Sequence, residues 1–266
     1  MAFLKRESGQ IHYETMGKGE PLLMLRGLGR SSRYWLGFEQ RLAKSFKVIQ
    51  MDMRGLGRTS LPMAWTDSMD DLADDCVALL DHLKIKSAHV FGLSLGGMVA
   101  LRLGSRHAAR CRSLVIANAS SADYPGFRLD PLAIKDIVIG RIRGQLHEAL
   151  LARTIPSAVA KVRGPEILQK WAAIREEEGL PMESVLKQLV AAARFTIRGR
   201  LKEGDVPILF VYGSLDGLVP HSNTRRMHKL VPGSSLQEIK GASHEIHVGH
   251  EIQLVKVLKE FCREAS

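Results

Sequence analysis

The sequence predicts an α/β protein with a mainly parallel sheet and helices on both faces. Short apolar runs bounded by turn residues alternate with longer amphipathic segments, as in doubly wound sheets. The 266 residues are 45% hydrophobic and 25% charged, which excludes a disordered, collagen-like or coiled-coil chain. Between about residues 121 and 204 the strand pattern stops and the segment is helical and basic. We therefore expect one core, residues 1–120 and 205–266, interrupted by a helical insertion, 121–204.

Strand-like runs before the insertion cover residues 10–16, 22–25, 47–52, 87–92 and 112–118. The first alternates apolar and polar residues, as a half-buried strand does, whereas LLML at 22–25 fits a strand covered on both faces. Helices are expected between these runs at 33–44, 68–83 and 98–104. The second should begin at Ser68, an N-cap residue with Asp71 three positions later. After the insertion, strands at 207–213 and 235–240 alternate with helices near 222–231 and 248–264.

Charge and cysteine usage exclude other function classes. The 38 Lys and Arg against 28 Asp and Glu give a net charge of +10, but the basic residues are scattered, so we expect no nucleic-acid partner. Cys76, Cys111 and Cys262 form no CxxC pair, so neither a disulfide framework nor a metal site is indicated. No apolar run is long enough to span a membrane, and the first residues lack a secretory h-region. We expect a cytoplasmic protein.

The motif with the clearest chemistry is GLSLGG at 92–97, between a predicted strand and a predicted helix. In that context the glycines permit a sharp turn that projects the Ser94 hydroxyl above the sheet edge. A serine nucleophile needs a base, and the base needs an orienting acid. Asp216 and His244 each follow a predicted strand, so all three residues fall at the edge where open α/β sheets build their sites.

With these motifs the chain resembles the α/β-hydrolase fold family over nearly its whole length, including GSLDGLVP around Asp216, GASH at His244 and DMRGLGRTS at 52–60. The resemblance implies an eight-stranded sheet with a helical cap at 121–204, Ser94 as nucleophile, His244 as general base and acid, and Asp216 as the residue that orients it. It assigns the oxyanion hole to the backbone N–H groups of Leu28 and Leu95. It implies a small-molecule ester or lactone as substrate, with no cofactor and no metal. Oligomeric state cannot be derived from the sequence.

Several alternatives remain open from the sequence. Many relatives have histidine where this chain has Arg26, which either braces the loop or attracts an anionic substrate group. Asp123 could replace Asp216 as the acid, although Asp216 lies in the better-matched loop. His247 and His250 continue a three-residue spacing from His244, which would place them along one helix face. A serine nucleophile is also compatible with carbon–carbon bond hydrolases, cofactor-free haloperoxidases, or a receptor with little turnover.

Overall fold

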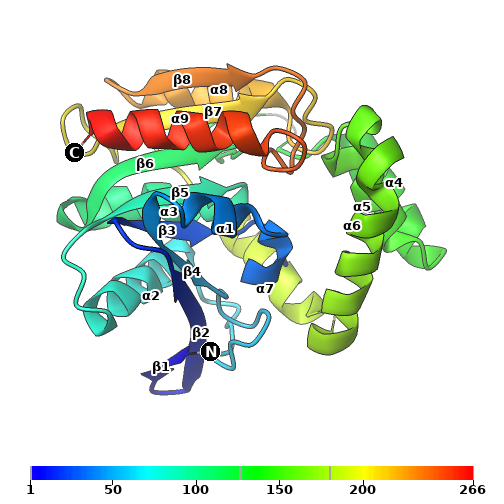
Figure 1. Ribbon diagram of the computed structural model, residues 1–266, viewed down its shortest axis with the longest axis horizontal. Coiled ribbons are helices and arrows are strands. Elements are labelled where there is room, and N and C mark those ends of the chain that lie inside the picture. Colours follow the sequence, from blue (N-terminus) through cyan, green and yellow to red (C-terminus); the bar gives the residue numbers. More distant parts are fainter. Residues whose placement is uncertain (1, 126–127, 180, 266) are drawn as a thin grey trace.

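A computed structural model of the chain describes residues 2–125, 128–179 and 181–265, and it is built on an eight-stranded sheet (Figure 1). The strand order is β1-β2-β4-β3-β5-β6-β7-β8, with β1 and β2 antiparallel to their neighbours and the remaining pairs parallel. The strands are β1 (Ala2–Arg6), β2 (Gly9–Met16), β3 (Glu20–Leu25), β4 (Phe46–Met51), β5 (Ala88–Leu93), β6 (Cys111–Ala117), β7 (Ile208–Gly213) and β8 (Ser235–Ile239). The predicted fold class is confirmed.

Helices cover both faces of the sheet because side chains of the central strands alternate between two cores. In β3, Leu23 and Leu25 belong to the core under α2, α3 and α8, whereas Leu22 and Met24 belong to the core under α1 and α9. These helices are α1 (Phe38–Leu42), α2 (Met69–His82), α3 (Leu95–Arg106), α8 (His221–Leu230) and α9 (Glu251–Glu264), with short 3₁₀ turns η1 (Ser32–Trp35) and η2 (Ala108–Arg110). The LLML run is thus a strand covered on both faces.

Two sequence expectations for this core were wrong. β1 was missed because only Leu4 of its five residues is buried, so the segment has no recognisable alternation. The single helix expected at 33–44 is instead η1 followed by α1. Leu36 and Gly37 both have positive φ, 55° and 94°, and this left-handed backbone ends η1 before α1 begins.

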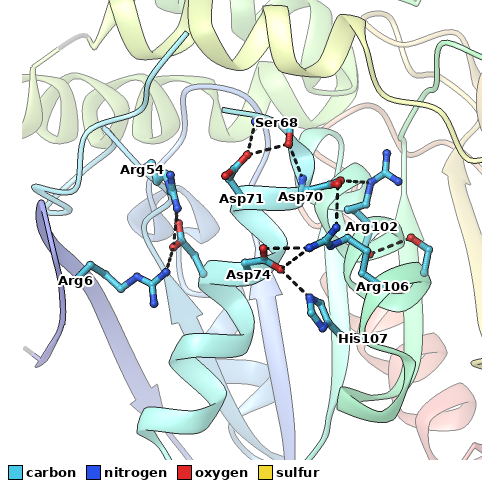
Figure 2. A network of polar contacts seen from close by, with 11 residues as sticks. Arg6, Arg54, Ser68, Asp70, Asp71, Asp74, Arg102, Arg106 and His107 are labelled. Atoms are coloured by element: carbon cyan, nitrogen blue, oxygen red, sulfur yellow. Dashed lines mark hydrogen bonds and ion pairs between the residues drawn. The ribbon is translucent and has the colours of Figure 1, made fainter. Parts of the chain in front are cut away.

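The N-terminus of α2 is the capping box that the sequence predicts (Figure 2). The Ser68 hydroxyl accepts from the Asp70 N–H at 3.1 Å, and the Asp71 carboxylate accepts from the Ser68 N–H at 2.8 Å. Arg102 and Arg106 on α3 form ion pairs with Asp70 at 2.8 and 3.1 Å. These contacts tie α3, which begins directly after Ser94, to its neighbouring helix.

Between β6 and β7, the residues that the structure describes form four helices in sequence: α4 (Pro131–Ile142), α5 (Leu146–Thr154), α6 (Ser157–Glu178) and α7 (Met182–Ala193). We call them the inserted helices. In Figure 1, α4, α5 and α6 form a separate group to the right of the sheet, and α7 lies closer to it. Of the helices in the described ranges, none is both long and apolar enough to cross a membrane.

Candidate active site

Ser94 occupies a strained turn between β5 and α3. Its φ of 58° and ψ of −118° are unusual for a residue with a side chain, and such conformations cost about 1–3 kcal/mol. The Ser94 N–H donates to the Ala117 carbonyl of β6 at 2.8 Å, which fixes the turn. A Cβ on Gly92 would lie 2.3 Å from the Gly96 carbonyl oxygen, and one on Gly96 would lie 2.3 Å from that of Leu25. Only glycine fits at these two positions, as the motif predicts.

Asp216 and His244 come together at the ends of β7 and β8. His244 Nδ1 lies 2.8 Å from Asp216 Oδ2, and Asp216 Oδ1 accepts from the N–H groups of Leu218 and Val219 at 2.9 and 2.8 Å. Burial lowers the pKa of His244, but the charge and hydrogen bond of Asp216, together with the charge of Glu245, outweigh burial, so this pKa lies above its ordinary value. With Nδ1–H donating to the carboxylate, Nε2 of the neutral ring is free to accept a proton.

Asn118 connects the histidine loop to the strand that holds the nucleophile turn. Its Nδ2 donates to the carbonyls of Ser243 and His244 at 3.0 and 2.9 Å, and its Oδ1 accepts from the Gly213 N–H at 3.0 Å. The preceding residue, Ala117, accepts from Ser94. Two successive residues of one strand end therefore anchor the loops of all three predicted triad members. Sequence reasoning did not select Asn118; the available signal was a polar residue directly after a buried strand.

The loop after β3 lies against the nucleophile. A Cβ on Gly27 would be 3.2 Å from Ser94 Cβ and 3.7 Å from Ser94 Oγ. Leu28, the first expected oxyanion donor, follows Gly27 directly. Leu95, the second, is the first residue of α3, where backbone N–H groups have no carbonyl partner within the helix. This placement is compatible with the predicted oxyanion hole, and the positive end of the helix dipole faces the same region.

Arg26 braces this loop through an ion pair with Glu245. Its Nη2 donates to both carboxylate oxygens of Glu245 at 2.9 Å, and its guanidinium lies 4.5 Å from the centre of the Trp35 ring. Burial raises the pKa of Glu245, but the charge of Arg26 together with His247, Arg30 and His244 outweighs burial and lowers this pKa to about 2. Because the Arg26 side chain is 2% exposed and pairs with Glu245 through Nη2, the structure supports the bracing interpretation over attraction of a substrate anion. Sequence reasoning missed Glu245, although it directly follows His244.

The other candidates lie apart from this arrangement. Asp123 accepts from the N–H groups of Ile197 and Arg198 at 2.7 and 3.2 Å, whereas Asp216 is the carboxylate that bonds to His244. The helix expected from 248 begins only at Glu251, so the histidines do not share a helix face. His247 is instead buried against Trp35 and Phe38, with ring centres 5.2 and 5.6 Å away. No group of three or more potential metal ligands converges anywhere in the described ranges.

Comparisons with known proteins agree with this architecture. The sequence pattern of the alpha/beta hydrolase fold matches residues 20–251. The chain is 28% identical over 258 residues to a pimeloyl-[acyl-carrier protein] methyl ester esterase of Aeromonas hydrophila, covering 94% of this chain and 98% of the relative. It is 27% identical to a putative carbamate hydrolase, RutD, of Agrobacterium fabrum, covering 90% and 91%. The crystal structure of the enol-lactonase from Burkholderia xenovorans LB400 superposes with a TM-score of 0.82 at 24% identity, covering 98% and 100%. The chain belongs to the alpha/beta hydrolase fold family.

Proposed function

We propose that this protein is a serine hydrolase that cleaves a small or medium carboxylic ester or lactone through an acyl-enzyme at Ser94. The observation that carries the proposal is the 2.8 Å contact between His244 and Asp216, anchored through Asn118 to the strand end that also holds Ser94. The names of the related proteins, a methyl ester esterase and a putative carbamate hydrolase, support hydrolysis of an acyl compound.

The geometry supports a two-step acyl transfer. His244 Nε2 takes the proton of the Ser94 hydroxyl as its oxygen attacks the ester carbonyl, and Asp216 stabilises the imidazolium that forms. The N–H groups of Leu28 and Leu95 bind the oxyanion, a contribution of about 10²–10³ in kcat for one such donor. His244 then returns its proton to the departing alkoxide. Water, deprotonated by the same nitrogen, attacks the acyl carbonyl; the bond to Ser94 Oγ breaks, His244 gives the proton to Oγ, and the carboxylic acid leaves.

The inserted helices, within residues 121–204, are proposed as the cap that limits substrate size. Three contacts support this role. The Thr154 carbonyl at the end of α5 accepts from the Glu245 N–H at 2.9 Å, next to His244. Arg30 lies between the rings of Tyr34 and Trp171 of α6, 4.2 and 4.4 Å from their centres. Gln188 of α7 bonds to the Gly29 N–H at 2.9 Å.

Labelling with a fluorophosphonate, followed by peptide mapping, tests the proposed nucleophile without knowledge of the natural substrate. We expect rapid stoichiometric labelling at Ser94 that is abolished in Ser94→Ala and reduced at least a hundredfold in rate in His244→Ala. Steady-state hydrolysis of 4-nitrophenyl butanoate then separates an enzyme from a receptor, because only an enzyme releases many equivalents of nitrophenol. Absence of labelling in a folded sample, shown by circular dichroism, would refute the proposal.

A further inference from the structure

The side-chain amide of Gln188 is fully buried and only half satisfied. Its Oε1 accepts from the Gly29 N–H at 2.9 Å, and because only the oxygen can accept, the NH₂ group must be at the other position. The side chain is 0% exposed. Nε2 makes no hydrogen bond to any of residues 2–125, 128–179 or 181–265. A buried donor left unpaired costs about 1–3 kcal/mol, so native proteins seldom keep one without a partner.

The Gln188 amide bonds to the loop that lies beside Ser94. Gly29 follows Leu28, the expected oxyanion donor, and Gly27 contacts Ser94. Gln188 therefore reaches from α7 to the same three-residue loop that faces the nucleophile. Val185, one turn earlier on α7, packs on Gly29 as well, since its Cγ2 would lie 2.7 Å from a Cβ at that position. One hydrogen bond of Gln188 and the packing of Val185 thus both join α7 to Gly29, at the boundary between the inserted helices and the core.

We propose that Gln188 is a specificity-determining residue, whose Nε2 donates a hydrogen bond to an acceptor oxygen in the acyl part of the substrate, close to the scissile carbonyl. This inference rests on the proposed ester hydrolase function. The ligand chemistry follows from the group itself: a neutral NH₂ in a buried position selects an ether, keto or ester oxygen over a methylene of the same size. A site built to pair such an oxygen discriminates against the analogue that lacks it.

Two pairs of 4-nitrophenyl esters test the assignment, each pair differing by one oxygen in place of a methylene: methoxyacetate against butanoate, and 3-methoxypropanoate against pentanoate. The measured quantity is the ratio of kcat/KM within each pair, relative to the wild type, which cancels intrinsic reactivity. Gln188→Glu, assayed at pH 8, keeps an acceptor for the Gly29 N–H and removes the donor. Gln188→Met removes both. Gln169→Glu makes the same chemical change at an exposed position of α6 and serves as the matched control.

We expect Gln188→Glu to lower the oxygen-to-methylene ratio about tenfold in at least one pair while hydrolysis of the methylene ester persists, since tenfold corresponds to about 1.4 kcal/mol, within the range of one hydrogen bond. Gln188→Met should lower the ratio similarly, and Gln169→Glu should leave it unchanged. Equal losses on both esters of each pair, with an unchanged ratio, would overturn the inference and leave Gln188 as a loop brace only. Absence of wild-type hydrolysis and of fluorophosphonate labelling would instead refute the proposed function, and the inference with it.

Discussion

Replacing Glu245 by glutamine should lower the free energy of unfolding by about 3 kcal/mol near neutral pH. The side chains of Arg26 and Glu245 are 2% and 7% exposed, so the change leaves a buried guanidinium without its counter-charge. Breaking such a pair from one side costs about 3–5 kcal/mol. The pKa gives an independent magnitude, because the fall from the ordinary value of 4.5 to about 2 corresponds to about 3 kcal/mol of preferential stabilisation of the carboxylate.

The same pKa sets the pH window of the effect. A carboxylate whose pKa is lowered by folding contributes stability above its unfolded pKa and loses it as the pH falls through the folded value. The contribution of Glu245 should therefore be complete above about pH 4.5 and disappear towards pH 2. Glu245→Gln should remove this part of the acid dependence, so wild type and variant should converge in stability as the pH is lowered.

The assay is urea unfolding followed by tryptophan fluorescence, since Trp35 lies 4.5 Å from the Arg26 guanidinium. The double variant Arg26→Met, Glu245→Leu completes a double-mutant cycle. Removing both charges of a buried pair is often nearly neutral, so the double variant should be more stable than Glu245→Gln and than Arg26→Met alone. Additive losses in the cycle, or a loss below 1 kcal/mol for Glu245→Gln, would refute the assignment of Arg26 as a charge-paired brace.

Three further predictions concern the site. With 4-nitrophenyl butanoate as substrate, kcat/KM should rise with pH with a midpoint above 6.5, because the raised pKa of His244 keeps the base protonated to higher pH. Asp216→Asn should lower this midpoint and reduce kcat about 10⁴-fold. Gly96→Ala should slow fluorophosphonate labelling at least tenfold, since its Cβ would collide with the Leu25 carbonyl and displace the Ser94 turn. Asp123→Asn should lower stability in urea by about 1 kcal/mol with the pH profile unchanged, because this carboxylate accepts from two backbone N–H groups away from His244.

Each of these predictions has a contradicting result. A midpoint at or below 6.5 in the wild type would show that Asp216 does not stabilise the protonated ring. Wild-type labelling rates in Gly96→Ala would mean that the turn tolerates the extra carbon. A shifted pH profile in Asp123→Asn would return that residue to consideration as the triad acid.

Local patterns made the sheet predictable and singled out the candidate residues Ser94, Asp216 and His244, because each signal lies within a few neighbouring residues. The capping box at Ser68 is complete within four residues. Glycine is required around Ser94 because a side chain there would collide with the backbone of the turn or of the adjacent strand end. β1 was not predicted because it is held by backbone pairing with β2, which leaves no pattern in its own side chains. The break at Gly37 depends on backbone torsions that an apolar helical pattern does not reveal.

The supporting residues of the site could not be predicted, because their partners are distant in the sequence. Glu245 and Arg26 are separated by 219 positions, and Gln188 and Gly29 by 159. Asn118 bonds to residues 95 and 126 positions further along the chain. Neither a carboxylate nor an amide indicates by its type alone which loop it will meet. These pairings depend on how the inserted helices and the strand ends pack in three dimensions.

At Ser94 the strained backbone lowers the stability of the fold, whereas the hydroxyl on the same residue is required for the proposed activity. Glycine adopts a φ of 58° without the strain that a side chain incurs there, about 1–3 kcal/mol. A selection for thermal resistance alone would therefore favour Ser94→Gly, a form that melts later and has lost its hydroxyl. Libraries screened for heat tolerance would be enriched in such inactive variants unless turnover is scored in the same cells. For this chain, an unusually stable variant with a substitution in the turn at Ser94 is a warning that the proposed nucleophile has been lost.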